Sequence, residues 1–415
     1  MKVLLVSQYF WPETFGINAL SLAFAERGVE LTVLTGKPNY PDGEVFAGHS
    51  AWGCRREDWR GIEVVRVPLF PRGRKSGWRL ALNYLSFVAA GLSFGPWLLR
   101  GRRFDAVFVY APSPILQTLP AIFLARQKRA PLALWVQDLW PESLAATGFV
   151  RNGKVLALVA RVVRFIYRHT DRLLVPSEGF RAPIAALTDD ARKIRYYPNA
   201  WVDETGPAAA DAPVAALAEK IAAGFSVVFA GNLGTAQALH TVIDAAERLQ
   251  REGSSVRFFL IGSGSVSGWL ATEVARRGLT NVELPGRFPP AAMPHCYAAA
   301  SALLVSLRDE PIFAQTIPSK VQGYLAAGRP VIAALNGEGA RVVVEAGAGL
   351  ACPAGDAAAL AAAVARLAAL DADARRKMGE NARRYAFEHF SLDRLADDLA
   401  AQLAELAATH RRKMT

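Results

Sequence analysis

The chain has 415 residues, of which 52% are hydrophobic and 20% are charged. This composition is typical of a globular protein with a large core, and the length favours two domains over one. The formal net charge of +11 indicates an anionic partner, whether a phosphorylated substrate, an anionic membrane surface or nucleic acid. Three widely spaced cysteines fit neither a disulfide framework nor a zinc site, and they indicate a reducing cytosol.

The N-terminal residues MKVLLVSQYF lack a signal-peptide apolar segment of proper length and are expected to form the first strand. Strands of a first series are predicted at residues 3–8, 31–35, 64–67, 106–110, 132–136 and 173–176. Helical stretches separate most of them, and this alternation is typical of a parallel sheet covered by helices on both faces.

A second series of strands is predicted at residues 226–230, 256–261, 282–284, 302–306, 331–334 and 350–352. Residues 199–224, rich in alanine, proline and acidic residues, are expected to be a linker and a lead-in helix. The sequence therefore predicts an α/β fold with two doubly wound, Rossmann-like domains, at 1–199 and 200–385. The last residues, 386–415, are expected to form a helix that packs back toward the first domain. In such sheets ligands bind at the carboxyl ends of the strands, so a cleft between the domains is the expected site.

The segment IPSKVQGYLAAGRPVIA, residues 317–333, predicts a phosphate site. Pro318 sets a helix start, Ser319 and Lys320 lie in the first turn, and Gly328 ends the helix before a core strand. Unpaired N–H groups and the positive end of the helix dipole attract phosphate, and a hydroxyl and an ammonium group strengthen the attraction. The alternative is an ordinary helix start followed by a strand.

Several motifs follow one another in a familiar order. They are VSQYFWPETFGINALSLAFAERGVELTVLTG, VQDLWPES, VVFAGNLGTAQALHTVIDAAERL, FFLIGSGS, VELPGRFPPAAMPHCYAAASALLVSLRD, IPSKVQGYLAAGRPVIA and GEGARVVVEAGAGLACPAGD. Together they cover nearly the whole chain, which resembles the retaining family 4 glycosyltransferases of the GT-B fold. Within that family it is most similar to bacterial fucosaminyl- and fucosyltransferases of O-antigen, colanic acid and capsule synthesis.

The resemblance implies that the second domain binds a nucleoside diphosphate sugar and the first domain binds the acceptor. The candidate donor-binding residues are Gly16, Asn18, Gly231, Asn232, Gly234, Gly262, Arg287, Arg308, Glu310, Ser319, Lys320, Glu338 and Glu345. Most family members carry two glutamates at the positions of Gln315 and Gly323, and an Arg and a Lys after the glycine of the loop that begins at Gly231. Because this chain lacks both pairs, Lys320, Arg308 or Arg287 must supply the cation, and an inactive member is a possible alternative.

The candidate catalytic residues are Asp138, Lys320 and Glu142. Asp138 follows the strand at 132–136, where a carboxylate can bind or deprotonate an acceptor hydroxyl, with Glu142 as a weaker partner. The alternative role for Asp138 is capping of the next helix.

Gly16 and Asn18 follow the first strand, where a glycine lets a phosphate approach the backbone; the alternative is a turn glycine. Glu338 is expected in a flexible loop, where it can contact sugar hydroxyls, and Glu345 on the next helix is expected to reach a ribose. Glu310 is expected to contact the donor sugar. For the glutamates the alternative is a solvated charge.

Residues 80–99 carry no charge and are long enough to span a bilayer. Spanning would separate strands expected in one sheet, so an interfacial insertion is favoured. Basic residues flank the run, namely Arg72, Arg74, Lys75, Arg79, Arg100, Arg102 and Arg103. A helical stripe of Arg161, Arg164, Arg168 and Arg172 adds positive charge that anionic lipid attracts. The alternative is a buried helix beside a solvated one.

These features predict a glycosyltransferase at the cytoplasmic face of the bacterial inner membrane, peripheral or monotopic. It would transfer a sugar, by resemblance N-acetyl-L-fucosamine or a related deoxysugar, from a nucleoside diphosphate to a polyprenyl-diphosphate-linked saccharide. The expected partners are this donor, this acceptor and the anionic membrane surface, without nucleic acid, cofactor or metal, since no Asp-x-Asp pair ends a suitable strand. A nucleotide-sugar epimerase, a non-catalytic membrane scaffold and a dehydrogenase remain as alternatives.

Overall fold

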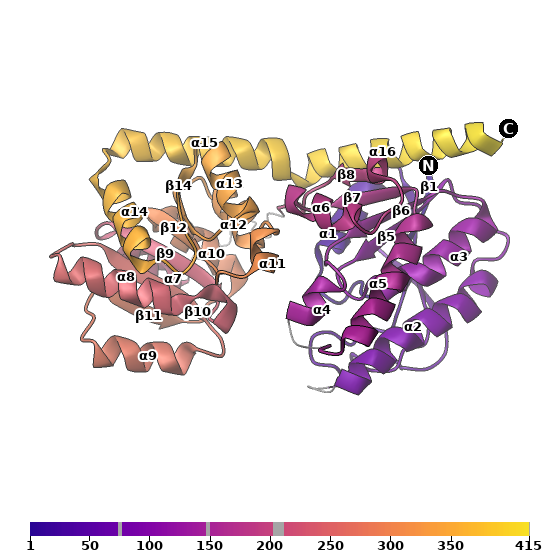
Figure 1. Ribbon diagram of the computed structural model, residues 1–415, viewed down its shortest axis with the longest axis horizontal. Coiled ribbons are helices and arrows are strands. Elements are labelled where there is room, and N and C mark those ends of the chain that lie inside the picture. Colours follow the sequence, from indigo (N-terminus) through magenta and orange to yellow (C-terminus); the bar gives the residue numbers. More distant parts are fainter. Residues whose placement is uncertain (74–76, 147–149, 202–210, 415) are drawn as a thin grey trace. The chain divides into compact units, whose positions relative to one another are not determined.

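A computed structural model describes residues 1–73, 77–146, 150–201 and 211–414 (Figure 1). Arg74, Lys75 and much of the expected linker lie outside the described residues. The chain divides into two compact units, the first formed by Met1–Asn199 with Leu392–Thr415 and the second by Ala200–Ser391.

The first unit is built on an eight-stranded sheet of order β3-β4-β2-β1-β5-β6-β7-β8. Its strands are β1 (Lys2–Val6), β2 (Glu30–Thr35), β3 (Arg55–Trp59), β4 (Ile62–Arg66), β5 (Ala106–Ala111), β6 (Leu132–Val136), β7 (Arg172–Val175) and β8 (Ile194–Tyr196). All neighbours are parallel except β3 and β4. The prediction of a parallel α/β sheet is confirmed, but β3 and β8 were not predicted. Strand β3 has the sequence RREDW and lies at the sheet edge, where charged side chains prevent pairing with another strand. Strand β8 has only three residues.

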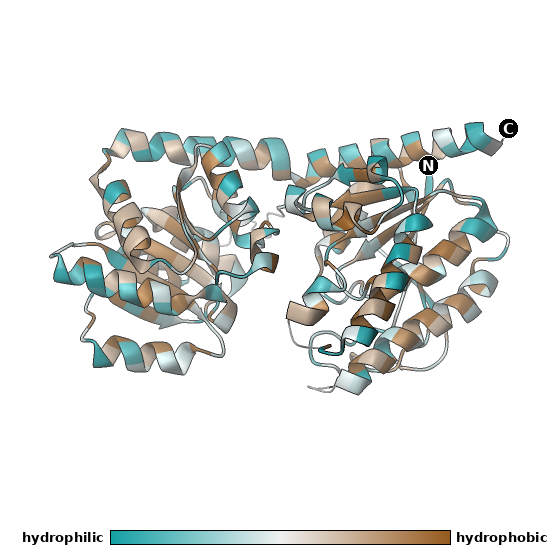
Figure 2. Ribbon diagram, in the orientation of Figure 1, coloured by the Kyte–Doolittle hydropathy of each residue, from teal (hydrophilic) through white to brown (hydrophobic). Residues whose placement is uncertain are grey.

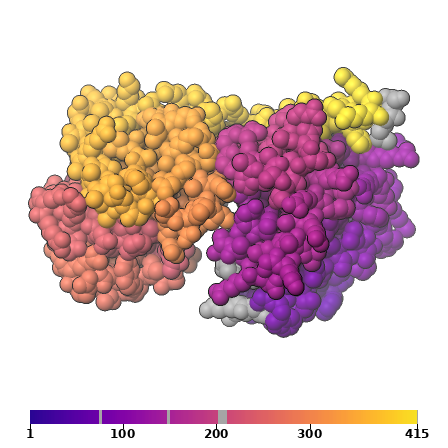
Figure 3. Space-filling view, in the orientation of Figure 1, coloured from indigo at the N-terminus to yellow at the C-terminus, as the bar shows by residue number. Residues whose placement is uncertain are grey.

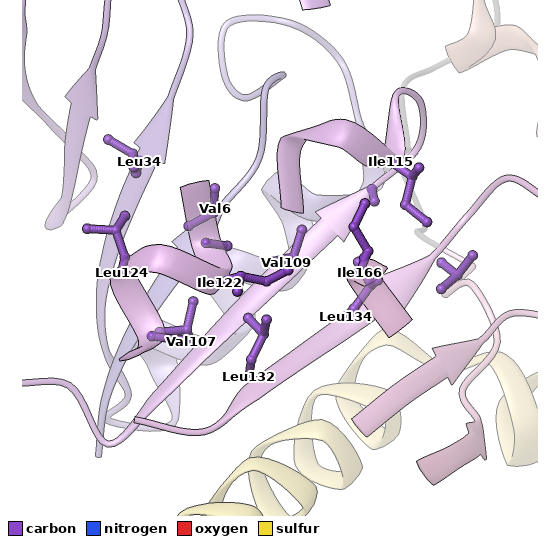
Figure 4. Packing of buried hydrophobic residues seen from close by; sticks show 14 of the residues in the cluster. Val6, Leu34, Val107, Val109, Ile115, Ile122, Leu124, Leu132, Leu134 and Ile166 are labelled. Carbon is purple, nitrogen blue, oxygen red and sulfur yellow. The ribbon is translucent and has the colours of Figure 1, made fainter. Parts of the chain in front are cut away.

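The helices of the first unit are α1 (Gly16–Glu26), α2 (Gly77–Leu98), α3 (Thr118–Lys128), α4 (Glu142–Ala146), α5 (Gly153–Arg168), α6 (Arg181–Ala185) and α16 (Leu392–Met414). Helices α2, α3 and α5 supply side chains to one apolar core cluster with the strands, and α3 contacts both of the others (Figure 1). In Figure 4, alternate strand residues such as Val107 and Val109 point into this cluster beside Ile122 and Ile166. Helices α1 and α16 pack against each other and contribute nothing to this cluster.

Helix α2 covers almost the whole uncharged run, but no helix in the described part of the chain is long and apolar enough to cross a membrane. One side of α2 is anchored in the unit. Asn83 is fully buried, and its amide donates to the carbonyl oxygen of Phe70 at 2.7 Å.

The prediction that Arg172 belongs to the basic stripe is wrong. Helix α5 ends at Arg168, and Arg172 is the first residue of β7. Its guanidinium is nearly buried, donates to the carbonyl oxygen of Gln402 and pairs with Glu405 of α16 at 2.9 Å. Arg172 follows Arg168 by four residues, which fits the spacing of the helical stripe, but the helix has ended before Arg172 is reached.

The second unit holds a six-stranded parallel sheet of order β11-β10-β9-β12-β13-β14. The strands are β9 (Ser226–Asn232), β10 (Arg257–Ser263), β11 (Val282–Gly286), β12 (Ala302–Ser306), β13 (Val331–Ala334) and β14 (Gly349–Cys352). The helices are α7 (Ala212–Ala222), α8 (Leu239–Arg251), α9 (Ser267–Arg276), α10 (Met293–Ala299), α11 (Pro311–Ala314), α12 (Ser319–Ala326), α13 (Glu338–Glu345), α14 (Ala357–Ala369) and α15 (Ala372–Phe390).

Successive residues of β9 point into two different cores of this unit. Val228 packs with α10, α12 and α13, whereas Phe229 packs with α8 and α14. The central strands are therefore largely apolar, as their colour in Figure 2 shows. Residues 386–390 end α15, and Phe390 is buried in the core of the second unit, while α16 begins at Leu392.

Candidate functional site

The second unit has a pocket of about 450 Å³ at the carboxyl ends of β9 and β10. Its walls are formed by Gly231, Asn232, Ile261, Gly262, Ser263, Arg287, Phe288, Pro290, Met293 and Tyr297. Two glycines shape it. Gly262 has φ of +143°, and a Cβ there would lie 1.8 Å from the carbonyl oxygen of Gly231, so only glycine allows the two strand ends to approach this closely.

A second pocket of about 300 Å³ lies in the same unit. It is lined by Gly234, Thr235, Leu239, His240, Val266, Trp269 and Arg308. The predicted residues Gly234 and Arg308 are both here, and Asn232 links the two pockets, because its side chain packs beside Gly234 and Gly264. The contributions of His240 and Trp269 were not predicted, since nothing in their spacing marks them.

Two arginines give this region positive charge. Arg287 is exposed, and no described residue forms an ion pair with it. The Arg308 guanidinium forms a looser pair with Glu310, at 3.7 Å, and the backbone N–H of Arg308 donates to the carbonyl oxygen of Ala236. The pockets therefore combine glycine-lined backbone with cations, which suits an anionic ligand.

Helix α12 begins at Ser319, as predicted, after Pro318 in extended conformation. Ser319 is exposed at the helix start. Lys320 lies in the first turn of this helix, and its Nζ is enclosed by the protein and has no hydrogen-bond partner among the described residues. The ammonium lies 3.6 Å from the centroid of the Phe229 ring, and its Cε is so near Gly231 that a Cβ there would meet it at 2.8 Å.

Burial lowers the pKa of Lys320 to about 7. An aromatic face attracts the charged form, but it does not replace the hydrogen bonds that water gives an ammonium group. A buried amine without an acceptor costs free energy, and functional sites commonly hold such groups. A phosphate oxygen near Gly231 would supply the missing acceptor.

The expectation of a loop position for Glu338 is wrong. Gly337, with φ of +73°, ends the loop, and Glu338 is the first residue of α13, where the helix dipole favours an acidic side chain. Its carboxylate pairs with Arg341 at 3.0 Å. Glu345, at the end of the same helix, also pairs with Arg341 and accepts a hydrogen bond from the Tyr385 hydroxyl at 3.4 Å. Neither glutamate lines the two pockets described above.

The first unit carries the predicted carboxylate Asp138 just after β6. The Trp140 indole nitrogen donates to its Oδ2 at 3.1 Å. Burial raises the pKa of Asp138, and the hydrogen bond from the Trp140 indole opposes that rise. Asp138 lies four residues before α4, and its hydrogen-bond donor Trp140 lies between it and that helix.

The other predicted residues of the first unit are placed as follows. Glu142 begins α4 and is exposed. Gly16 begins α1, and a Cβ added to it would meet no neighbour. The Asn18 amide is used within the preceding loop, since it accepts from the N–H of Trp11 and donates to the carbonyl oxygen of Glu13.

Two family descriptions match this chain. "Glycosyl transferase 4-like domain" matches residues 16–200 and "Glycosyl transferases group 1" matches residues 224–369, so each of the two units has its own match. The chain belongs to the family 4 glycosyltransferases. The resemblance inferred from the motifs is thus confirmed.

This glycosyltransferase is similar to curated bacterial proteins. It is 28% identical over 346 residues to the putative colanic acid biosynthesis glycosyl transferase WcaI of Escherichia coli, covering 79% of this chain and 82% of WcaI. It is 29% identical over 310 residues to the probable glycosyltransferase WbjE of Pseudomonas aeruginosa, covering 73% of this chain and 75% of WbjE. Among solved structures, Anabaena HepE in complex with UDP has the same fold, with a TM-score of 0.68 at 16% identity over 98% of this chain and all of HepE.

Proposed function

We propose that this glycosyltransferase moves a sugar from a nucleoside diphosphate to a polyprenyl-diphosphate-linked saccharide, with retention of configuration, in bacterial surface polysaccharide synthesis. The donor sugar we propose is N-acetyl-L-fucosamine or a related deoxysugar. The reaction would take place at the cytoplasmic face of the inner membrane.

The observation that carries the donor half of the proposal is the pair of unused cations around the glycine-lined strand ends. The Lys320 amine is enclosed and has no hydrogen-bond partner among the described residues, and Arg287 forms no ion pair with any of them. A nucleoside diphosphate brings two phosphates that need such donors, and a departing diphosphate gains charge in the transition state. The names of WcaI and of HepE in complex with UDP support the polysaccharide context and a uridine nucleotide.

Replacement of Arg287 by alanine tests the donor pocket. A single charge-assisted phosphate contact is worth roughly 1.5–3 kcal/mol, so we expect the dissociation constant for UDP, measured by calorimetric titration, to rise about tenfold or more. Arg276→Ala is the matched control, because it removes the same charge from α9, where the guanidinium pairs with Glu273 instead. Failure of the folded wild type to bind UDP, GDP or their sugars would refute the proposed activity.

The membrane half of the proposal rests on the outer side of α2. We call this the α2 apolar face, and its exposed side chains are Trp78, Leu82, Leu85, Leu92, Phe94 and Trp97. Trp78 is 64% and Trp97 58% exposed, and residues 80–98 carry no charge. Exposed apolar surface of this extent is typical of an interaction site.

Helix α5 supplies positive charge on the same side of the sheet as α2. Arg161, Arg164 and Arg168 are exposed, and no described residue pairs with them. Leu158 is also exposed, so the helix shows alternating polar and apolar turns in Figure 2. In Figure 3 the magenta segments that include α5 form part of the outer surface of the first unit. Anionic lipid attracts each such arginine by about 1 kcal/mol.

Vesicle sedimentation tests this surface. We expect the protein to sediment with anionic vesicles at low salt and to be released as salt rises, because ions screen surface charge. Replacing Leu82, Leu85, Leu92 and Trp97 with serine should abolish sedimentation with the vesicles and leave UDP binding unchanged. Leu98 is left unchanged, since it is only 6% exposed and belongs to the core.

The control variant carries Trp52→Ser and Val344→Ser, which replace exposed apolar residues outside α2. It should sediment as the wild type does. A wild type that stays in the supernatant with anionic vesicles at low salt would contradict a membrane role for this surface.

A further inference from the structure

Two arginines flank the start of α2, and both lie against aromatic rings. The Arg72 guanidinium is 5.1 Å from the Tyr40 ring centroid, and that of Arg79 is 5.7 Å from the Trp78 ring and 6.0 Å from the Phe70 ring. Neither forms an ion pair with any carboxylate of the described residues. Aromatic faces hold a guanidinium plane in place and leave its N–H groups available to an anion.

The position of Arg72 is fixed by buried polar groups. Its backbone N–H donates to Asn39 Oδ1 at 3.1 Å, and the same oxygen accepts from the amide of Asn83 at 3.2 Å. The Gln8 amide donates to Asn83 Oδ1 at 2.7 Å. Arg72 is therefore tied both to α2 and to the segment that follows β1.

Tyr84 of α2 lies near both Arg72 and Asp138. Its hydroxyl lies near the side chains of Ser113 and Tyr9. Its ring is 6.4 Å from that of Trp140, which donates to Asp138. Burial raises the pKa of Tyr84, nearby Arg72 lowers it, and Asp138 raises it, so both charges act on this one hydroxyl.

The chemical kinds of these groups match the parts of a lipid-linked sugar. Such a molecule presents an apolar chain, then two phosphates, then sugar hydroxyls. The first unit holds the α2 apolar face, two guanidinium groups without carboxylate partners, and the polar side chains of Tyr84 and Asp138. Guanidinium groups suit this task because they bind phosphate oxygens in pairs.

We propose that Arg72 and Arg79 bind the diphosphate of a prenyl-diphosphate-linked acceptor, beside Tyr84 and Asp138, which receive its first sugar. The assignment rests on the proposed function for the identity of the acceptor. The ligand chemistry it requires, a diphosphate on an apolar chain, can be tested without transfer.

The test compares two double variants of the full chain. Arg72→Ala with Arg79→Ala removes the proposed anion site. The matched control, Arg100→Ala with Arg103→Ala, removes the same charge from the other end of α2, where Arg100 likewise lies over a tryptophan ring, at 5.9 Å from that of Trp97. The probe is farnesyl diphosphate, with farnesol as the uncharged reference.

We expect the wild type and the control to bind farnesyl diphosphate alike, and the Arg72/Arg79 variant to bind it at least tenfold more weakly. The three proteins should not differ from one another in their affinity for farnesol or in their affinity for UDP. In transfer assays the Arg72/Arg79 variant should show a raised KM for the diphosphate-linked acceptor, with KM for the donor unchanged.

Equal loss in the control, or equal farnesyl diphosphate binding by the wild type and the Arg72/Arg79 variant, would overturn the proposal. So would a loss confined to plain anionic vesicles, which would make the two arginines contacts for lipid headgroups. Arginine-dependent binding of farnesyl diphosphate by a protein that transfers no sugar would support the anion site and refute the proposed transfer.

Discussion

Replacing Lys320 with methionine is expected to stabilise the protein and to weaken donor binding and turnover about tenfold or more. The Lys320 amine is enclosed against Phe229 and lacks an acceptor, so methionine removes an unsatisfied polar group while filling similar space. The same change removes a charge-assisted phosphate contact of roughly 1.5–3 kcal/mol. Thermal unfolding and calorimetric titration with UDP measure the two effects.

The pH dependence of donor binding should identify Lys320 independently. Burial lowers its pKa to about 7 in the free protein, and a bound phosphate would raise it again. Below pH 7 the amine is already charged, so affinity should be nearly constant. Above pH 7 binding must bring one proton to Lys320, so the dissociation constant of the donor should rise up to about tenfold per pH unit.

Stability should show the opposite trend in the same range. The unfolded chain keeps the Lys320 proton up to the ordinary lysine pKa, whereas the folded chain loses it near pH 7, so the free energy of unfolding rises with pH between these values. Lys320→Met should remove this rise. Lys220→Met is the control, because Lys220 is exposed in the same unit. Donor kinetics in Lys320→Met equal to those of the wild type would remove Lys320 from the site.

Much of the fold could be predicted because its strands are apolar on both faces. Residues 132–136, 302–306 and 331–334 were predicted at the bounds that the structure shows. Strand β3 could not be found in this way, because the run RREDW owes its place to pairing with β4 at the sheet edge. Arg172 shows the same limit, since the arginine spacing continues past the residue where α5 ends.

The glycines of the proposed donor pocket could be predicted, whereas the direction of its side chains could not. Gly231 and Gly262 follow the predicted strands and lie at the carboxyl ends of β9 and β10, where their conformations require glycine. The Lys320 amine lies over the Phe229 ring because α12 packs against β9. Such a contact between distant segments cannot be predicted from a local sequence pattern. Likewise, the helix that begins at Glu338 depends on the left-handed conformation of Gly337, and a glycine between two polar residues fits a loop equally well.

Asp138→Asn is expected to abolish sugar transfer while leaving stability and UDP binding nearly unchanged. Asparagine keeps the shape of the side chain and one oxygen to accept from the Trp140 indole, so the local hydrogen bonds can persist. It cannot hold a negative charge against an acceptor hydroxyl, and loss of such a group typically costs 10²–10⁴-fold in rate. Transfer by the wild type should also fall as the pH drops through the pKa of Asp138, which burial raises above its usual range.

Asp171→Asn provides the matched control at the other end of the same strand. Asp171 Oδ2 accepts the N–H of Leu132, the first residue of β6, at 2.8 Å, so both aspartates hold hydrogen bonds at a strand end. A purely structural role predicts that the two variants lose similar, small amounts of stability and keep transfer. A catalytic role for Asp138 predicts that Asp138→Asn loses transfer, whereas Asp171→Asn, which also removes one negative charge, keeps it. Wild-type transfer by Asp138→Asn would assign the residue to the folding of its loop.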